Sequence, residues 1–480
     1  MEEELAQIAA DGFNTIILVI PWREFQPSVM PLTYNPYAFE KLDQVMEAAE
    51  KQRLSVMFRV GYTWDYYGDE SSVYRFRELL RSEAVRNGWL AYAGRIYETG
   101  SRYSNFCGGF MTWEDFWNYT ENMGRDMAMS SRIRMAKDCG YQAYLEENYT
   151  LDQVRGFYGP KLETFEQVYI PYKDHPSAEL FYEFYDHFLT ELTTETQAVF
   201  PGLSLEIRAD GDIVYDGMGG KKYYSHSATY PCPGADYAAL MYSVSMGQEN
   251  TGNKISASTA LEAMTRNLDS IYAAAGKPLY IEQLLYMDST EAFSHNTQVE
   301  DEQVGEFVRN LAPVLSGRTN GYGLWVYRNY VNNAVYNSQF ALDQEGWSFS
   351  GDSRIEERNG SKAAVIGKKG SISQDLDGRI PGSSRIHVEF YAEAENGGAS
   401  VTVQLGGDEQ TIHVGEGKTY RMEFASLPRY TFSITAERRI HVDDIRVYTY
   451  EQNGRIYERD GSAGDLAGDF RTLNGELAAE

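Results

Sequence analysis

Short β-branched and aromatic runs alternate with longer amphipathic stretches along the first 335 residues, and this alternation limits the fold more than any other feature. The runs that we expect to be strands lie at 13–22, 54–62, 106–114, 203–210, 237–245, 278–286 and 321–329. The stretches between them, such as 34–52 and 178–200, carry apolar residues at the three- and four-residue spacing of helices. Repeated βα units of this kind predict a parallel sheet.

Seven runs are one short of the eight strands of a closed parallel barrel, and the chain begins with a helical stretch, "EEELAQIAADG", where such a barrel begins with a strand. We therefore expect residues 1–336 to form an α/β domain, a (β/α)8 TIM barrel that lacks its first strand. That strand would lie upstream of Met1, and a signal peptide could precede it.

The sequence changes character near residue 337. Short alternating runs separated by Gly, Asn and Asp turn residues follow up to about residue 450, and they predict an antiparallel, jelly-roll-like β-sandwich over 337–450. Residues 451–480 are rich in Gly, Asp and Glu. We expect them to be a poorly ordered tail, or the start of a further element.

Composition removes several classes of function. The formal net charge is −27 and Lys and Arg form no cluster, which argues against nucleic acid or an anionic membrane as a partner. No window is apolar enough to span a bilayer. The three cysteines lie far apart, without the spacing of a zinc site or a disulfide framework, so we expect chemistry without a metal or other cofactor. Aromatic residues make up 14% of the chain, which suits the binding of sugar rings.

Two glutamates stand where a parallel barrel places its chemistry, at the C-terminal ends of strands. Glu114 closes the third run between Trp113 and Trp117, and Glu282 shares a face of its run with Tyr280. Glycosidic cleavage needs such a pair: one carboxyl group held protonated, which a poorly solvated aromatic setting favours, and one ionised. A separation of about 5 to 5.5 Å predicts retention of anomeric configuration, and about 6.5 to 9.5 Å predicts inversion.

Structural explanations remain open for both residues. Glu114 could simply begin a helix, because acidic residues favour the first turn. Glu282 could be a buried ion-pair partner of Arg208. Glu206 is a third candidate carboxylate, and because Arg208 and Asp210 share its face, we expect it to belong to an ion-pair network.

With one strand taken as missing, "MTWEDFW" falls on the fourth strand and "LYIEQ" on the seventh. In this register the N-terminal region resembles the retaining (β/α)8 glycoside hydrolases of the cellulase and β-galactosidase superfamily. The stretch "DGFNTIILVIPWREFQP" looks like the second-strand segment of these enzymes, and 141–171 is similar to the segment after the fourth strand of family 42 β-galactosidases. The resemblance implies that Glu114 is the acid/base and Glu282 the nucleophile.

The same resemblance suggests further substrate-binding residues. Trp325 would be the floor for the sugar ring, and Tyr242 would match the tyrosine that hydrogen-bonds the nucleophile. The remaining candidates are Tyr327, Arg59, Arg208, Asp210 and Trp64. One departure stands out: these enzymes have an Asn before the acid/base glutamate, to bind the sugar 2-hydroxyl, where this chain has Trp113. Asn118 or Asn105 could replace that Asn, or the chain could be a divergent or non-hydrolytic member.

The opening of the sandwich, "NSQFALDQEGWSFSG", resembles jelly-roll carbohydrate-binding modules. Trp347 could be a ligand platform or part of the core, and the sandwich could equally be a purely structural brace. Taken together, the sequence predicts a retaining glycoside hydrolase whose partner is an oligosaccharide or polysaccharide, met outside the cell or at its surface. The alternative is a catalytically inactive glycan-binding or surface-scaffold protein on the same barrel.

Overall fold

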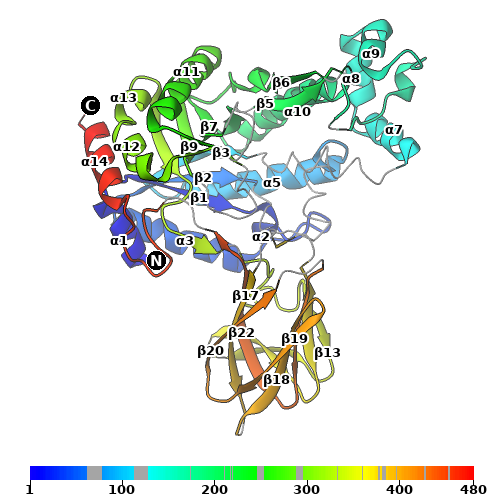
Figure 1. The fold of residues 1–480 in the computed structure, drawn as a ribbon. Coiled ribbons are helices and arrows are strands. Elements are labelled where there is room, and N and C mark those ends of the chain that lie inside the picture. Colours follow the sequence, from blue (N-terminus) through cyan, green and yellow to red (C-terminus); the bar gives the residue numbers. More distant parts are fainter. Residues whose placement is uncertain are drawn as a thin grey trace.

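The structure is a computed structural model, and its first domain is built on seven parallel strands, which helices surround (Figure 1). The residues that it describes are 1–61, 78–112, 128–172, 174–209, 211–216, 218, 220–245, 253–287, 296–331, 333–358, 360–376, 379–380, 385–395, 397–425, 429–451 and 455–479. The strands, in their order across the sheet, are β1 (Thr15–Ile20), β2 (Ser55–Val60), β3 (Phe106–Met111), β4 (Ser204–Arg208), β7 (Ala238–Ser243), β9 (Leu279–Leu285) and β11 (Thr319–Leu324). Every neighbouring pair is parallel, and all seven predicted strands are confirmed.

The sheet curls until its two edge strands, β1 and β11, face each other. A Cβ atom built on Gly323 of β11 would lie 2.6 Å from Cδ1 of Ile17 on β1, so only a glycine allows this approach. The ring of Phe13, just before β1, also contacts Tyr322 of β11 at 6.3 Å between centroids. The seven strands therefore form a nearly closed barrel, as the alternation of runs predicts.

Helices cover the outside of the barrel. They include α1 (Glu2–Ala10), α3 (Pro36–Lys51), α5 (Glu83–Gly100), α10 (Ala178–Gln197), α11 (Ala257–Ala275), α12 (Val304–Arg309) and α13 (Ala312–Leu315). The start of α3 shows why they form where they do: Asn35 accepts a hydrogen bond from the Tyr37 amide, and Pro36 occupies the first turn. Phe39, Leu42 and Met46 then recur at helical spacing and are buried.

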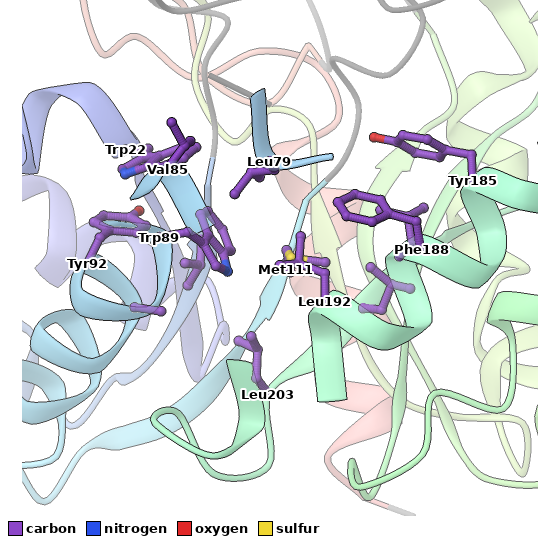
Figure 2. Close-up of a cluster of buried hydrophobic side chains, with 14 of the residues drawn as sticks. Trp22, Leu79, Val85, Trp89, Tyr92, Met111, Tyr185, Phe188, Leu192 and Leu203 are labelled. Carbon is purple, nitrogen blue, oxygen red and sulfur yellow. The ribbon is translucent and has the colours of Figure 1, made fainter. Parts of the chain in front are cut away.

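Large aromatic side chains fill the layer between strands and helices. The rings of Trp22 and Trp89 lie 5.1 Å apart at an angle of 79°, and the Trp89 indole N–H donates to Thr196 Oγ1 at 2.8 Å. Figure 2 shows this cluster, with Met111 of β3 and Leu192 of α10 beside it. Most of the aromatic content of the chain that is described here serves packing of this kind.

Two insertions project from the barrel after β3 and β4. The first carries the short helices α7 (Met129–Asp138), α8 (Tyr141–Asn148) and α9 (Leu151–Tyr158), which stand apart from the strands (Figure 1). The second is an antiparallel hairpin of β5 (Gly211–Tyr215) and β6 (Lys221–Ser225). Because both follow the C-terminal end of a strand, they extend the side of the barrel on which active sites of this fold are built.

The second domain is an antiparallel sandwich of two five-stranded sheets, as predicted. One sheet contains β13 (Ser348–Ser350), β16 (Ser371–Asp375), β21 (Thr431–Ala436), β18 (Ala399–Leu405) and β19 (Asp408–Val414). The other contains β14 (Arg354–Arg358), β15 (Ser361–Ile366), β22 (Ile440–Tyr448), β17 (Arg385–Ala394) and β20 (Lys418–Ala425). Trp347 is buried in the core between them, against Phe340, and its indole N–H donates to the Asn337 carbonyl. Of its two predicted roles, it therefore has the structural one.

The expectation of a poorly ordered tail is wrong. After the sandwich, β23 (Tyr450–Glu451) pairs with β12 (Tyr330–Val331), and the chain returns to the barrel, where residues 467–477 form α14 (Ala467–Leu477). Phe470 and Leu473 of this helix are fully buried in the same apolar cluster as β9 and α12. The barrel domain is thus made of two parts of the chain, with the sandwich between them.

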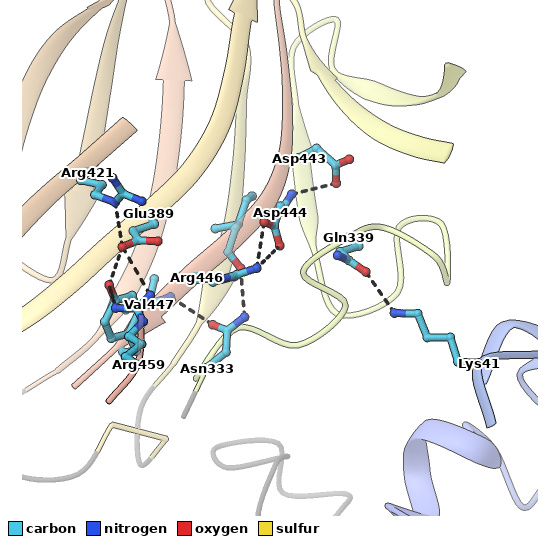
Figure 3. Close-up of polar contacts among 12 residues, drawn as sticks. Lys41, Asn333, Gln339, Glu389, Arg421, Asp443, Asp444, Arg446, Val447 and Arg459 are labelled. Carbon is cyan, nitrogen blue, oxygen red and sulfur yellow. Dashed lines mark hydrogen bonds and ion pairs between the residues drawn. The ribbon is translucent and has the colours of Figure 1, made fainter. Parts of the chain in front are cut away.

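The sandwich contacts the barrel near the C-terminal end of β1. The Arg23 guanidinium, on the short helix α2 (Trp22–Phe25), lies 4.7 Å from the ring centre of Tyr336 and forms an ion pair with Glu345 at 3.6 Å. Lys41 of α3 donates to Gln339 at 3.3 Å (Figure 3). The sandwich is therefore held near the mouth of the barrel. Within the described residues, no helix has the length and apolar character needed to cross a membrane.

Candidate functional site

The interior of the barrel changes from apolar to charged along its strands. Near the N-terminal ends it is filled by an apolar layer made of Ile17, Met57, Phe110, Ala239, Tyr237 and Tyr280. Two residues further along β2, on the same face as Met57, stands Arg59. The corresponding positions on β4 and after β3 are Glu206 and Thr112. We call Arg59, Thr112, Glu206, Glu282 and Gln283 the polar layer; each is at most 7% exposed.

Arg59 is the centre of the polar layer. Its Nη2 forms an ion pair with Glu206 Oε2 at 2.9 Å and donates to Thr112 Oγ1 at 3.1 Å, while Nη1 donates to Gln283 Oε1 at 3.1 Å. The Thr112 hydroxyl donates to the same Glu206 oxygen at 2.9 Å. The side chains of Arg59 and Glu206 are 2% and 0% exposed. Burying two charges is costly, and this arrangement offsets the cost by hydrogen bonds to both of them.

A β-bulge places two consecutive side chains of β9 in the barrel. Ile281 pairs with Leu240 of β7, but Gln283 pairs with the next residue, Met241, so Glu282 is the extra residue. Ile281 and Leu284 face the helices, in a cluster with α11 and α12. Glu282 keeps the face of Tyr280, and Gln283 faces inward because it contacts Arg59. The bulge thus brings a carboxylate that is 4% exposed to the polar layer.

Glu114 lies outside the described residues, as do Trp64 and Asp210. The chain is anchored two residues before it. The Thr112 amide donates to the Val60 carbonyl at 3.0 Å, and the Thr112 hydroxyl is held by the ion pair of Arg59 with Glu206. Thr112, the last described residue before Glu114, therefore lies in the polar layer.

Trp325 directly follows β11. Its amide donates to the Leu284 carbonyl at 3.4 Å, and the peptide bond from Trp325 to Val326 is cis. Gly321 and Gly323 face into the barrel, since a Cβ atom on them would meet the ring of Tyr280 and the side chain of Ile17. Alternation along β11 gives Trp325 the same face. Arg208 shares the face of Glu206 by the same rule and is buried.

Two predicted site residues do not reach the barrel interior. Tyr242 lies on the outer face of β7, packed among residues of α11, and its hydroxyl contacts Asn267. Burial there raises the pKa of Tyr242. Tyr327 turns away after β11, and its hydroxyl donates to Asp11 at the end of α1, at 2.6 Å. Both predictions are wrong as to position, because Tyr242 takes the helix-facing side of its strand and because the chain turns after Trp325.

The structure also settles the positions of Glu206 and Asn105. Glu206 does belong to an ion-pair network, but its partner is Arg59 on β2 instead of its neighbour Arg208. Asn105, which could have bound a sugar hydroxyl, donates to the carbonyls of Met46 and Leu54 before β3 begins. It therefore lies at the N-terminal end of the barrel, away from the polar layer.

Thr112 and Gln283 are not among the residues that the sequence predicts for the site. Thr112 has a visible signal, since it shares a face with Phe110 and Glu114 at the end of a run. Gln283 has none, because simple alternation places it opposite Glu282. Within the described residues, no three His, Cys, Asp or Glu side chains meet in a group that could hold a metal ion.

No protein-family model matches this sequence, and no curated protein matches it either. Similar solved structures include the GH5_18 protein from Streptomyces cattleya in complex with GlcNAc, with 14% identity and a TM-score of 0.44. The alignment covers 68% of this chain and 65% of that one. A cold-adapted β-galactosidase from Rahnella sp. R3 has 11% identity and a TM-score of 0.46, over 68% of this chain and 48% of that one.

A smaller likeness involves a single module. TmCBM61, a structure in complex with β-1,4-galactotriose, covers 24% of this chain and 97% of its own length, with 19% identity and a TM-score of 0.20. The chain spans less than two thirds of the GH5_18 protein and about half of the β-galactosidase. At these identities the likenesses concern the fold, and the chemistry has to be argued from the residues of this chain.

Proposed function

We propose that the chain is a retaining glycoside hydrolase that cleaves O-glycosidic bonds in oligosaccharides or polysaccharides. The observation that carries the proposal is the bulge in β9, which puts the Glu282 carboxylate inside a parallel barrel, in the polar layer toward the C-terminal ends of the strands. The C-terminal side is where barrels of this type do their chemistry.

In the proposed reaction, Glu282 attacks the anomeric carbon while the glycosidic C–O bond breaks. Glu114 gives its proton to the leaving oxygen, and a glycosyl ester of Glu282 forms. Glu114, now ionised, takes a proton from water, whose oxygen attacks the same carbon and releases Glu282. Atoms and charges balance without any cofactor.

The other polar-layer residues have supporting roles in this proposal. Arg59 neutralises Glu206 at 2.9 Å and keeps this second carboxylate out of the reaction. The Thr112 hydroxyl holds the end of β3, from which the chain continues to Glu114. Trp325, on the inward face beyond β11, would offer its ring to the apolar face of a sugar.

The proposal is tested by replacing Glu282 with Gln and, separately, Glu114 with Gln. Turnover of 4-nitrophenyl β-glycosides of glucose, galactose, mannose and N-acetylglucosamine is measured for each variant. We expect Glu282→Gln to lose about 10⁴-fold or more in kcat, and Glu114→Gln to lose less on these substrates, whose leaving group needs little protonation. Glu183→Gln is the matched control, because this carboxylate accepts hydrogen bonds from Tyr144 and Tyr149 on the helical insertion side. Full turnover by Glu282→Gln would remove it as the nucleophile.

A second candidate function is a catalytically inactive glycan-binding protein on the same barrel. It is favoured by Trp113, which stands where the resembling enzymes have an Asn. Binding of an oligosaccharide without turnover of any glycoside in a broad panel would support this alternative over the hydrolase. For either function we propose that the glycan is met outside the cell, which fractionation of the producing cells would test.

A further inference from the structure

The amide orientation of Gln283 is fixed by its neighbour. Arg59 Nη1 lies 3.1 Å from Gln283 Oε1. A guanidinium carries only donors, so the atom of Gln283 that faces it has to be the oxygen. The NH₂ group must then point away from Arg59. The hydrogen bond from Arg59 therefore fixes the direction in which the two N–H donors of Gln283 point.

Arg59 cannot turn to release this constraint. Its second nitrogen is held by Glu206 at 2.9 Å and Thr112 at 3.1 Å, and its side chain is 2% exposed. These three residues come from β2, from the end of β3 and from β4, so three separate parts of the barrel hold the guanidinium in place. An amide bound to such a fixed group is preorganised, which lowers the entropy lost when it binds a ligand.

The NH₂ group of Gln283 has donors to offer. Gln283 is 7% exposed, and within the described residues its Nε2 meets no acceptor. Nε2 is not among the fully buried polar atoms that lack a partner, so its N–H groups are open to the solvent side. The same group is therefore well suited to an acceptor that arrives with a ligand.

We propose that Gln283 donates a hydrogen bond to the sugar hydroxyl on the carbon next to the anomeric carbon. The inference rests on the proposed function, because it takes the anomeric carbon to lie at Glu282. The bulge makes Glu282 and Gln283 consecutive inward residues, so a ring attacked by the first presents its neighbouring hydroxyl to the second. Gln283 binds substrate directly, and Arg59 acts only as a positioning residue. Gln283 of β9 would then make the contact to the sugar 2-hydroxyl that the resembling enzymes make with the Asn for which this chain has Trp113.

The experiment compares the 4-nitrophenyl β-glycosides of glucose, galactose and mannose, which carry a 2-hydroxyl, with their 2-deoxy counterparts. Binding is measured by calorimetry in protein carrying Glu282→Gln, so that hydrolysis does not interfere. With native Gln283, removal of the 2-hydroxyl should weaken binding about tenfold, the effect of one hydrogen bond. Adding Gln283→Met should weaken binding of the parent glycoside by a similar factor and leave binding of the 2-deoxy compound nearly unchanged. The ratio of the two dissociation constants, 2-deoxy compound to parent, should then fall to about one.

Gln283→Glu guards against a merely structural effect. The glutamate keeps an acceptor for Arg59 but has no N–H donor, so it should also abolish the discrimination. Gln142→Met is the matched control: Gln142 is a glutamine of similar burial whose Nε2 donates to the carbonyls of Ile133 in α7 and Val168 after α9. It should lower thermal stability and leave the ratio unchanged.

The outcomes separate the two proposals. An unchanged ratio in both Gln283 variants overturns the role of Gln283, even where turnover depends on Glu282. Turnover that is independent of Glu282, together with a ratio that depends on Gln283, removes Glu282 as the nucleophile and leaves the binding role of Gln283 standing. Absence of binding by every glycoside to the protein with native Gln283 contradicts both.

Discussion

The two domains place their charged groups on opposite sides of their sheets. In the barrel, Arg59 and Glu206 lie inside the ring of strands and are almost fully buried. In the sandwich, the core between the sheets is apolar, and charge pairs lie on the outer face. There, Glu389 accepts from Arg421 at 3.0 Å and from Tyr448 at 2.6 Å (Figure 3).

This difference separates a site from a scaffold. The sandwich pair keeps one of its charges in water, since Arg421 is 73% exposed although Glu389 is 9% exposed, and pairs with an exposed member contribute little. A buried pair is often no more stabilising than apolar residues of the same size. The charged interior of the barrel is thus better explained by chemistry or ligand binding than by stability, whereas the sandwich does not require this explanation.

The largest expected effect comes from breaking the buried pair. Arg59→Met leaves Glu206 buried without its main counter-charge, so the free energy of unfolding should fall by about 3 to 5 kcal/mol. Arg421→Met, on a side chain that is 73% exposed, should cost less than about 1 kcal/mol. Urea unfolding measures both. Equal losses in the two variants would show that the barrel and sandwich pairs do not differ in kind.

The double replacement Arg59→Met with Glu206→Leu sharpens the same comparison. Removing both charges together should recover most of the stability that Arg59→Met loses, because no uncompensated charge remains. Ligand binding should not recover, since the amide of Gln283 loses its anchor.

A medium effect is expected at Asp11, a buried carboxylate on the helical side of the barrel. Burial alone would raise its pKa, but hydrogen bonds from Tyr327, Tyr457 and Arg471 hold the pKa below its usual value. A lowered pKa gives stability that is present above the unfolded pKa of about 3.9 and is lost as pH falls through the folded pKa. Asp11→Asn should therefore cost about 2 kcal/mol at pH 7, and the difference from the native chain should shrink below about pH 4.

The same unfolding series, repeated between pH 7 and pH 3.5, measures this pH dependence. A deficit that stays constant down to pH 3.5 would mean that the charge of Asp11 contributes nothing. A deficit that shrinks with falling pH would instead show that the ionised Asp11 carboxylate contributes to stability.

The smallest effect is expected at Asp443 of the sandwich. Burial raises its pKa to about 6, with a smaller contribution from the charge of Asp444. Because the folded pKa lies above the unfolded value, the native state takes up protons between about pH 4 and pH 6, and its stability falls as pH rises through that window. Asp443→Asn should thus stabilise the chain by about 1 kcal/mol above pH 6 and have little effect near pH 4. Thermal unfolding at pH 4.5 and pH 8 checks the sign.

Local patterns predicted the strands because the central ones, such as β4 and β7, are buried on both faces and read as apolar runs. All seven barrel strands and the antiparallel sandwich follow from such runs and from turn residues. The partner of Glu206 could not be predicted in this way, since Arg59 is 147 residues away along the chain. Only the closure of the sheet brings β2 and β4 close enough for the pair to form.

The site was predicted less completely, for a reason that lies in one residue of β9. Alternation along β9 gives Glu282 the correct face but predicts that Gln283 points outward. On β7, alternation does not settle which face Tyr242 takes. A single extra residue in the pairing reverses the expectation for Gln283, and nothing in "PLYIEQLLY" marks it. The tail was missed because its buried apolar residues, such as Phe470 and Leu473, are scattered among Gly and Asp.

The pairing of β12 with β23 has a practical consequence. The strands that lead into and out of the sandwich are neighbours, so joining residue 331 directly to residue 450 would excise the module without opening the barrel. Stopping the chain at residue 336 would instead strip α14 from the apolar surface near Tyr286 and Tyr322. A module tethered by two paired strands is also more restricted in its rotation against the barrel than one joined by a single linker.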